Sequence, residues 1–163
     1  MSSPFSFREV RAITYHLVFD EDVLKRYFVY YFQLYPKRRM LPIGHPYHPS
    51  INEWMIMKRP QMNATKQKWK EFIVWFIDQQ GYANLRIEKC DIEFRTFYYT
   101  NRPHDCDNSV PKFILDGLVD SGMLVNDDNR HVLSLKLECF VDAKRPRTEI
   151  DIIVRDEGEC PDG

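Results

Sequence analysis

Residues 86–100 read R-I-E-K-C-D-I-E-F-R-T-F-Y-Y-T, and apolar and polar side chains alternate along this stretch. One face would carry five residues spaced two apart: Cys90, Ile92, Phe94, Thr96 and Tyr98. Such alternation is typical of a half-buried β-strand, because successive side chains of a strand point to opposite faces. A loop that reads R-P-H-D-C-D-N follows at 102–108. The stretch therefore predicts a β-sheet and places two aspartates just beyond the end of one of its strands.

Two stretches predict helices, because their apolar residues recur with a period near 3.6. In residues 66–79 the apolar positions fall at i, i+3, i+4, i+7 and i+8, and Gly81 follows as a stop signal. The second stretch begins at Pro111, which is tolerated in a first helical turn, and ends at Gly122, which fits a C-terminal cap. We expect both helices to pack against the predicted sheet.

Three further strands are predicted. Residues 27–35, Y-F-V-Y-Y-F-Q-L-Y, are β-branched and aromatic, which favours a buried strand. Strands are also expected at 131–141 and 148–154, and the short basic turn between them predicts an antiparallel hairpin. The fold class that follows is α+β, a mixed β-sheet with helices packed mainly on one face.

The length of 163 residues fits one compact domain with appendages. We divide the chain into an N-terminal extension at 1–26, a domain at 27–155 and an acidic tail at 156–163. The first 26 residues fit either a strand or a helix, and sealing a sheet edge is one role open to them. No stretch has the roughly 18 apolar residues of a membrane span, and the first residues lack the features of a signal peptide. We expect a cytoplasmic protein without a membrane partner.

Cysteine spacing argues against two other classes of protein. The four cysteines show no C-x-x-C spacing, so neither a zinc knuckle nor a disulfide framework is predicted. Cys90 and Cys139 lie in alternating segments and are expected to be small core residues. The spacing of His104 and Cys106 with His45 or His48 matches no zinc pattern either.

Charge is unevenly distributed although the net charge is only −1. Residues 36–71 carry eight Lys and Arg against two acidic residues, whereas residues 72–163 carry eleven against eighteen. Such asymmetry usually describes a solvated face, but it also fits a phosphate-binding surface beside an acidic metal site. Under the second interpretation the nucleic-acid contacts would come from eight residues: Lys37, Arg38, Arg39, Lys58, Arg59, Lys66, Lys70 and Arg102.

Four aspartates in two segments are the candidate metal ligands. Asp105 and Asp107 lie one residue apart, so in an extended loop both carboxylates point the same way. Asp127 and Asp128 lie in the turn N-D-D-N, after the second helix. The two pairs can meet only if the strand after this turn pairs close to the strand that ends near Thr100. A polar turn with Asx-type caps on a helix is the alternative explanation for Asp105 and Asp107, and an ordinary helix-to-strand turn is the alternative for Asp127 and Asp128.

If the carboxylates converge, their oxygen ligands favour Mg²⁺, with Mn²⁺ as a possible substitute. Such a site leaves room for water and a phosphate oxygen, which suits metal-assisted phosphodiester hydrolysis. Lys112 follows the acidic loop and would stabilise the transition state or orient the nucleophile. It could equally form an ordinary i, i+4 ion pair with Asp116.

The order of these motifs resembles the RusA-type Holliday junction resolvases, the crossover junction endodeoxyribonucleases of phages and bacteria. The similar elements are D-C-D-N at 105–108, Lys112, F-I-L-D-G-L-V-D-S-G at 113–122, N-D-D-N at 126–129 and P-R-T-E-I-D-I-I-V at 146–154. The similarity covers residues 101–154 and extends weakly upstream through P-S-I-N-E-W at 49–54 and the basic stretch at 66–72.

The resemblance implies a homodimeric, Mg²⁺-dependent endonuclease that nicks four-way DNA junctions in a bacterial or phage-infected host cell. It implies that Asp105, Asp107 and Asp128 hold the metal, with Asp127 beside them, and that Lys112 is the essential lysine. One departure concerns this lysine: three residues separate it from D-C-D-N, where the family's best-known members have two. Two alternatives stay open, a nucleic-acid-binding module that does not cut, and a nuclease for flaps or forks.

Overall fold

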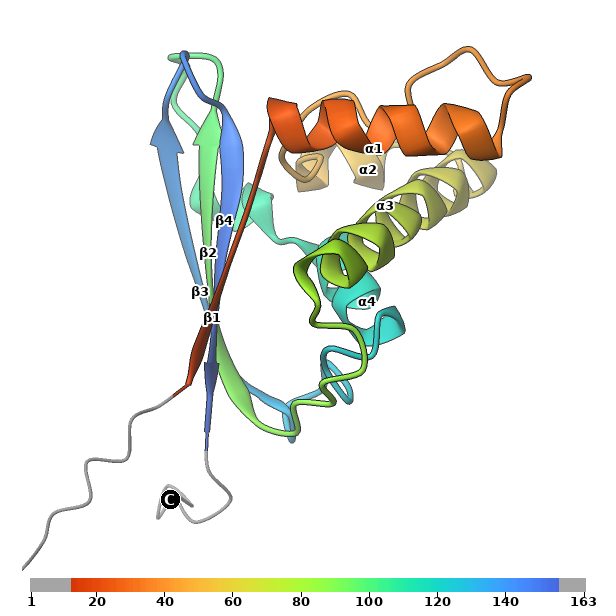
Figure 1. Ribbon diagram of the computed structural model, residues 1–163. Helices are drawn as coiled ribbons and strands as arrows, with labels where there is room; N and C mark the ends of the chain where they lie inside the picture. The colour runs from red at the N-terminus through yellow and green to blue at the C-terminus, as the bar shows by residue number, and fades with distance from the viewer. Residues whose placement is uncertain (1–12, 156–163) are drawn as a thin grey trace, which may run out of the picture.

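A four-stranded mixed sheet forms one layer of the computed structural model, which describes residues 13–155 (Figure 1). Its strands are β1 (Thr14–Asp20), β2 (Cys90–Tyr98), β3 (Val132–Val141) and β4 (Arg147–Val154), in the order β1-β4-β2-β3. β2 pairs with β3 in parallel, whereas β4 runs antiparallel to both β2 and β1. The α+β class and the mixed sheet predicted from the sequence are confirmed.

The helices form a second layer on one side of the sheet (Figure 1). They are α1 (Glu21–Leu34), α2 (Ile51–Met55), α3 (Arg59–Gln80) and α4 (Lys112–Asp120), with a 3₁₀ turn, η1 (Cys106–Ser109), before α4. The two predicted helices correspond to α3 and α4, and α3 begins earlier than expected because Pro60 fits its first turn. In the part of the chain that the structure describes, no helix is long and apolar enough to cross a membrane.

The core lies between the two layers. Every second residue of β2 is buried, as its alternation predicted, and Ile92 and Phe94 belong to the same core as the apolar stripe of α3. On α3 this stripe comprises Trp69, Phe72, Ile73, Phe76 and Ile77. Cys90 is a core residue as expected, whereas Cys139 is only half-buried.

The predicted strand at 27–35 is wrong, because these residues form most of α1. Asp20 caps this helix by accepting a hydrogen bond from Val23 N–H at 3.1 Å, and two acidic residues follow in its first turn. Tyr27 and Tyr31 are buried one helical turn apart, and Tyr27 packs on Phe72. Packing of this aromatic face on α3 overrides the strand preference of the residue types.

The boundary of the expected N-terminal extension is also corrected. β1 pairs with β4 along its whole length and forms one edge of the sheet, and α1 runs through residue 26 without a break. Residues 14–26 therefore belong to the domain. The beginning of that segment, residues 1–12, and the predicted acidic tail at 156–163 lie outside the described residues.

The predicted hairpin of the last two strands does not form. β3 and β4 flank β2 on opposite sides instead of pairing with each other. The β2–α4–β3 segment is a crossover connection that makes β2 and β3 parallel neighbours. β4 then takes the other side of β2, where Arg95 of β2 forms ion pairs with Asp151 at 2.7 Å and Glu149 at 3.7 Å.

Candidate functional site

The N-terminal end of α4 brings together the two segments that carry the predicted metal ligands. Lys112 is the first residue of α4, directly after η1 and the acidic loop. Its Nζ donates hydrogen bonds to Asp116 Oδ1 at 3.2 Å and to Asp127 Oδ2 at 3.3 Å. The acidic turn thus returns to the start of α4, and the strand that follows it does pair with β2. The expected i, i+4 pair of Lys112 with Asp116 is also present.

Burial lowers the pKa of Lys112, but the hydrogen bond and charge of Asp116 and the charge of Asp127 outweigh it, so the pKa is raised above its ordinary value. Lys112 is therefore an ammonium group at neutral pH. It supplies the positive charge that lets these two carboxylates approach each other. A group in this state can stabilise negative charge but cannot accept a proton.

Asp116 has one oxygen without a hydrogen bond. Lys66 Nζ of α3 lies 3.3 Å from Asp116 Oδ2, close enough for an ion pair. The lysine does not satisfy this oxygen as a hydrogen-bond donor, and the oxygen is buried. The ion pair with Lys66 still stabilises Asp116. The attraction between opposite charges depends on their distance, whereas a hydrogen bond also needs a favourable angle. Asp116 is thus a half-buried brace between α3 and α4.

Asp128 is held by its own turn. Arg130 donates to Asp128 Oδ2 through Nη2 at 2.7 Å and through Nε at 3.2 Å, and the Arg130 backbone N–H donates to Oδ1. The hydrogen bond from Arg130 lowers the pKa of Asp128, so this carboxyl is ionised at neutral pH. The Arg130 side chain is 77% exposed, and ion pairs in such positions contribute little to stability. A competing cation can therefore displace it.

Asp105 lines a cavity of about 420 Å³ together with Asn108. The opposite wall comes from the segment that precedes and begins α2, including Ser50 and Asn52. Segments that come before and after α3 in the sequence therefore line the same cavity. Asp107 lies in η1, one residue after Cys106.

His48 connects this cavity to α4, and no motif of the sequence points to it. It lines the cavity, is almost completely buried, and accepts a hydrogen bond through Nε2 from the backbone N–H of Phe113 at 3.0 Å. Nδ1 then carries the proton and donates to the carbonyl of Pro49 at 2.7 Å. Burial lowers the pKa of His48 to about 4, so the ring is neutral. It serves as a helix cap supplied from a distant loop, where the local residues supply none.

Within residues 13–155, the structure does not gather the four predicted aspartates into one metal site. Asp127 and Asp128 lie in the acidic turn beside Lys112, and Asp105 faces the cavity. Among residues 13–155, no three His, Cys, Asp or Glu side chains are arranged to hold a metal ion together. The donor chemistry fits Mg²⁺, since all four candidate ligands are carboxylates. The arrangement does not present a formed site.

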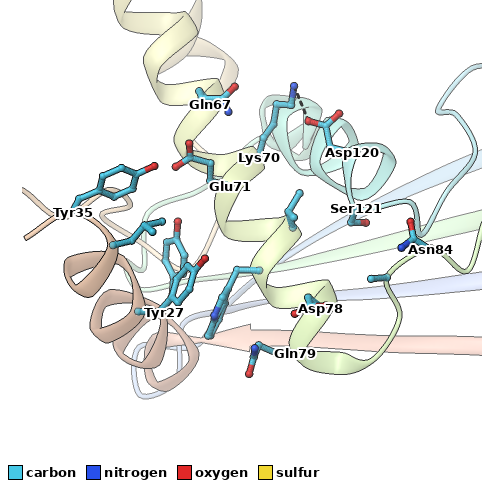
Figure 2. Close-up of a pocket in the computed structure, with 15 residues that line it drawn as sticks. Tyr27, Tyr35, Gln67, Lys70, Glu71, Asp78, Gln79, Asn84, Asp120 and Ser121 are labelled. Carbon is cyan, nitrogen blue, oxygen red and sulfur yellow. Dashed lines mark ion pairs between the residues drawn. The ribbon is translucent and has the colours of Figure 1, made fainter.

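The predicted DNA-binding residues differ in their surroundings. Lys66 and Lys70 join α3 to α4, and Lys70 Nζ lies 2.8 Å from Asp120 (Figure 2). Arg38 donates to the Tyr31 hydroxyl and lies over the ring of Tyr35. Within residues 13–155 we find no ion pair for the remaining five: Lys37, Arg39, Lys58, Arg59 and Arg102.

A larger cavity of about 630 Å³ lies between α1, α3 and the end of α4 (Figure 2). Its walls are aromatic and polar, with Tyr27, Trp75 and Glu71 among them, and it contains none of the four predicted aspartates. Size alone would favour this cavity as the functional site. The smaller cavity is the better candidate, because it contains a predicted ligand, Asp105, and polar side chains from segments before and after α3.

Comparison with known proteins adds no assignment. No protein-family model matches the chain, and no curated protein matches it. The functional assignment therefore depends on the motifs of the sequence and on the geometry at the start of α4.

Proposed function

We propose that this protein is a Mg²⁺-dependent endonuclease with a RusA-like fold that cuts Holliday junctions or other branched DNA. One observation carries the proposal: the D-C-D-N loop, the S-I-N segment and the acidic turn all lie around the N-terminal end of α4. Asp105 and Asn52 line one cavity there, and Lys112 binds Asp127. The D-C-D-N loop directly precedes α4 in the sequence, whereas the S-I-N segment and the acidic turn reach this end of the helix through tertiary contacts.

In the proposed reaction, Asp105, Asp107 and Asp128 would hold the metal, with Asp127 beside them. Bound Mg²⁺ would lower the pKa of a water molecule and neutralise charge on the phosphate. Asp128 would give up its exposed ion pair with Arg130 to bind the metal. Lys112 stays charged and stabilises the negative charge that develops on the phosphate during the reaction. Asp116 holds the lysine in place through the 3.2 Å hydrogen bond.

The proposed DNA substrate agrees with the charge distribution of the chain. The basic segment at 36–71 would bind phosphates, and shape rather than base sequence would select the substrate. A four-way junction has two strands to cut at symmetric positions. A symmetric homodimer would present two copies of the site to them.

Cleavage of a labelled synthetic four-way junction tests the proposal. We expect paired nicks with Mg²⁺, with Mn²⁺ as a substitute, and none with EDTA. Asp107→Asn removes a charged ligand at nearly constant shape and should abolish the nicks. Asp78→Asn is the matched control, because Asp78 is an exposed residue of α3 that lines the larger cavity. It should cut like the unmodified protein.

Lys112→Ala tests the role of the lysine separately from that of the metal ligands. Loss of one positive group that stabilises the transition state typically lowers the rate by about 100-fold or more. We expect such a loss in single-turnover cleavage, while junction binding is largely kept.

Two results would change the assignment. Junction binding without cleavage under any condition would favour the non-catalytic binding module and contradict the nuclease. Faster cutting of flaps or forks than of four-way junctions would keep the nuclease and change its substrate.

A further inference from the structure

β3 is not buried, although it is the longest strand in residues 13–155. It has ten residues, and none of them is buried, whereas β1, β2 and β4 all have buried members. Leu135 pairs in register with Ile92 of β2 and so faces the helix layer, yet it is 39% exposed. The helix layer therefore leaves Leu133 and Leu135 partly uncovered, whereas Val132 and Leu137 pack against the core.

The outer edge of β3 is also unpaired. β3 is the last strand of the sheet, and no strand of the described residues lies beyond it. Unpaired backbone N–H and C=O groups on such an edge are a template for another strand. Typical strands have about 5–6 residues, so this edge is long. A long, partly apolar edge of this kind needs a partner or it becomes an aggregation site.

The sequence of β3, V-L-S-L-K-L-E-C-F-V, is complementary to itself in one antiparallel register. With Leu137 on a two-fold axis, Lys136 of one chain lies opposite Glu138 of the other, and the reverse pair forms at the same time. On the other face, Leu137 meets its own copy and Leu135 meets Cys139. Opposite charges directly across an antiparallel pair are stabilising.

Neighbouring registers lack this match. A two-fold axis at Lys136 or at Glu138 places two like charges directly opposite each other, which is destabilising. The register centred on Leu137 also pairs residues 133–141, which is nearly the whole strand. Within one chain, Lys136 Nζ lies 3.0 Å from Glu138 Oε1. Both side chains are therefore on the same face of the strand, where they can form ion pairs with a second chain.

We propose that two copies of this chain associate through their β3 edges, antiparallel and centred on Leu137, to form a continuous eight-stranded sheet. The proposed function assumes a dimer but does not say which surface forms it. This edge is also close to the acidic loop, because Cys139 of β3 contacts Ser109 of η1 at 3.4 Å. Self-association can be measured without DNA or metal, so its failure is distinguishable from failure of the nuclease proposal.

Charge reversal at the two paired positions tests the register. Molar mass by sedimentation equilibrium should show a dimer for the unmodified protein. Lys136→Glu and Glu138→Lys each place like charges opposite each other twice, and each should weaken dimerisation at least tenfold. The double variant Lys136→Glu/Glu138→Lys exchanges the charges and should dimerise again.

Mixing the two single variants gives the sharpest result. In an equimolar mixture, both cross-chain pairs become opposite in charge, so heterodimers should form although neither variant dimerises alone. Lys136 and Glu138 also lie beside Glu93 and Arg95 of β2 in the same chain. If a substitution prevented dimerisation only by disturbing contacts within its own chain, mixing the two variants would not restore it. Dimerisation in the mixture therefore reports pairing between chains. A monomeric unmodified protein at about 50 µM, or single variants that dimerise like it, would overturn the proposal.

Discussion

His48 shows how one buried side chain can make the fold sensitive to pH. Both ring nitrogens are used, one as acceptor for the first turn of α4 and one as donor to Pro49. Protonation would remove the acceptor and leave a charge in a buried position. Burial accordingly lowers the pKa of this histidine from 6.5 to about 4. The unfolded chain therefore takes up a proton at a higher pH than the folded chain does.

We expect the free energy of unfolding to fall as the pH drops from about 6.5 towards 4, and the stabilisation to be complete above this range. The decrease in the free energy of unfolding that is caused by His48 is about 3 kcal/mol at most. His48→Gln keeps a donor and an acceptor but does not titrate, so its stability should depend less on pH. Urea denaturation between about pH 7 and pH 4.5 measures both.

His45→Gln is the control for this experiment, since His45 is exposed in the same loop. It should follow the unmodified protein at every pH. An equal pH dependence in His48→Gln would show that other groups cause the loss of stability.

The packing of α3 on α4 depends on a glycine that has no conformational role. Gly117 lies in the middle of α4, and a Cβ added to it would come within 2.6 Å of Ile73 Cβ on α3. The two helices are thus close enough for Lys66 and Lys70 to form ion pairs with α4. Since Lys112 and Asp116 are on α4, the distance between these helices also sets the position of the candidate site.

Gly117→Ala should therefore destabilise the protein. Overpacking of this kind costs about 1–3 kcal/mol, and the better helix propensity of alanine offsets up to about 1 kcal/mol. A lower midpoint in thermal or urea unfolding checks the prediction. Gly44→Ala is the matched control, because a Cβ added at Gly44 would meet no atom within 4 Å, and it should have little effect. Equal stability of the two variants would contradict the close contact.

Across the whole molecule, the basic residues of the 36–71 segment divide into two kinds. Lys66 and Lys70 are paired with carboxylates of α4, whereas no ion pair involves Lys58 or Arg59 at the start of α3 in the described part of the chain. A lysine that already neutralises a carboxylate releases fewer counterions when it meets a phosphate. Lys58 and Arg59 are thus better suited to bind DNA than Lys66 and Lys70.

Lys58→Gln/Arg59→Gln should reduce the salt dependence of junction binding. The slope of log affinity against log salt should become shallower by about 2, since each phosphate contact contributes about 0.9. Lys66→Gln/Lys70→Gln should change the slope less and the unfolding midpoint more. Fluorescence anisotropy over a range of salt concentrations measures the slopes. Identical slopes for the two double variants would contradict the division of the basic residues into those paired with α4 and those available to bind phosphates.

Local pattern was sufficient for most of the secondary structure. The alternation of β2, the periodicity of α3 and the glycine after α4 each reflect neighbours within a few residues, and all three were predicted correctly. The candidate ligands were likewise chosen from residue type and spacing. The segment at 27–35 was wrongly predicted to be a strand, because its aromatic residues suit a strand as well as a helix. Its packing on α3 stabilises the helix.

Contacts between segments that are distant in the sequence could not be predicted from local pattern and were found only in the tertiary structure. Strand order depends on which apolar faces are covered, so β4 lies at the centre of the sheet and β3 at its edge. The return of Asp127 to Lys112 and the capping of α4 by His48 join residues that no periodicity links. Periodicity reports the environment of one element, whereas these meetings depend on the packing of several elements at once.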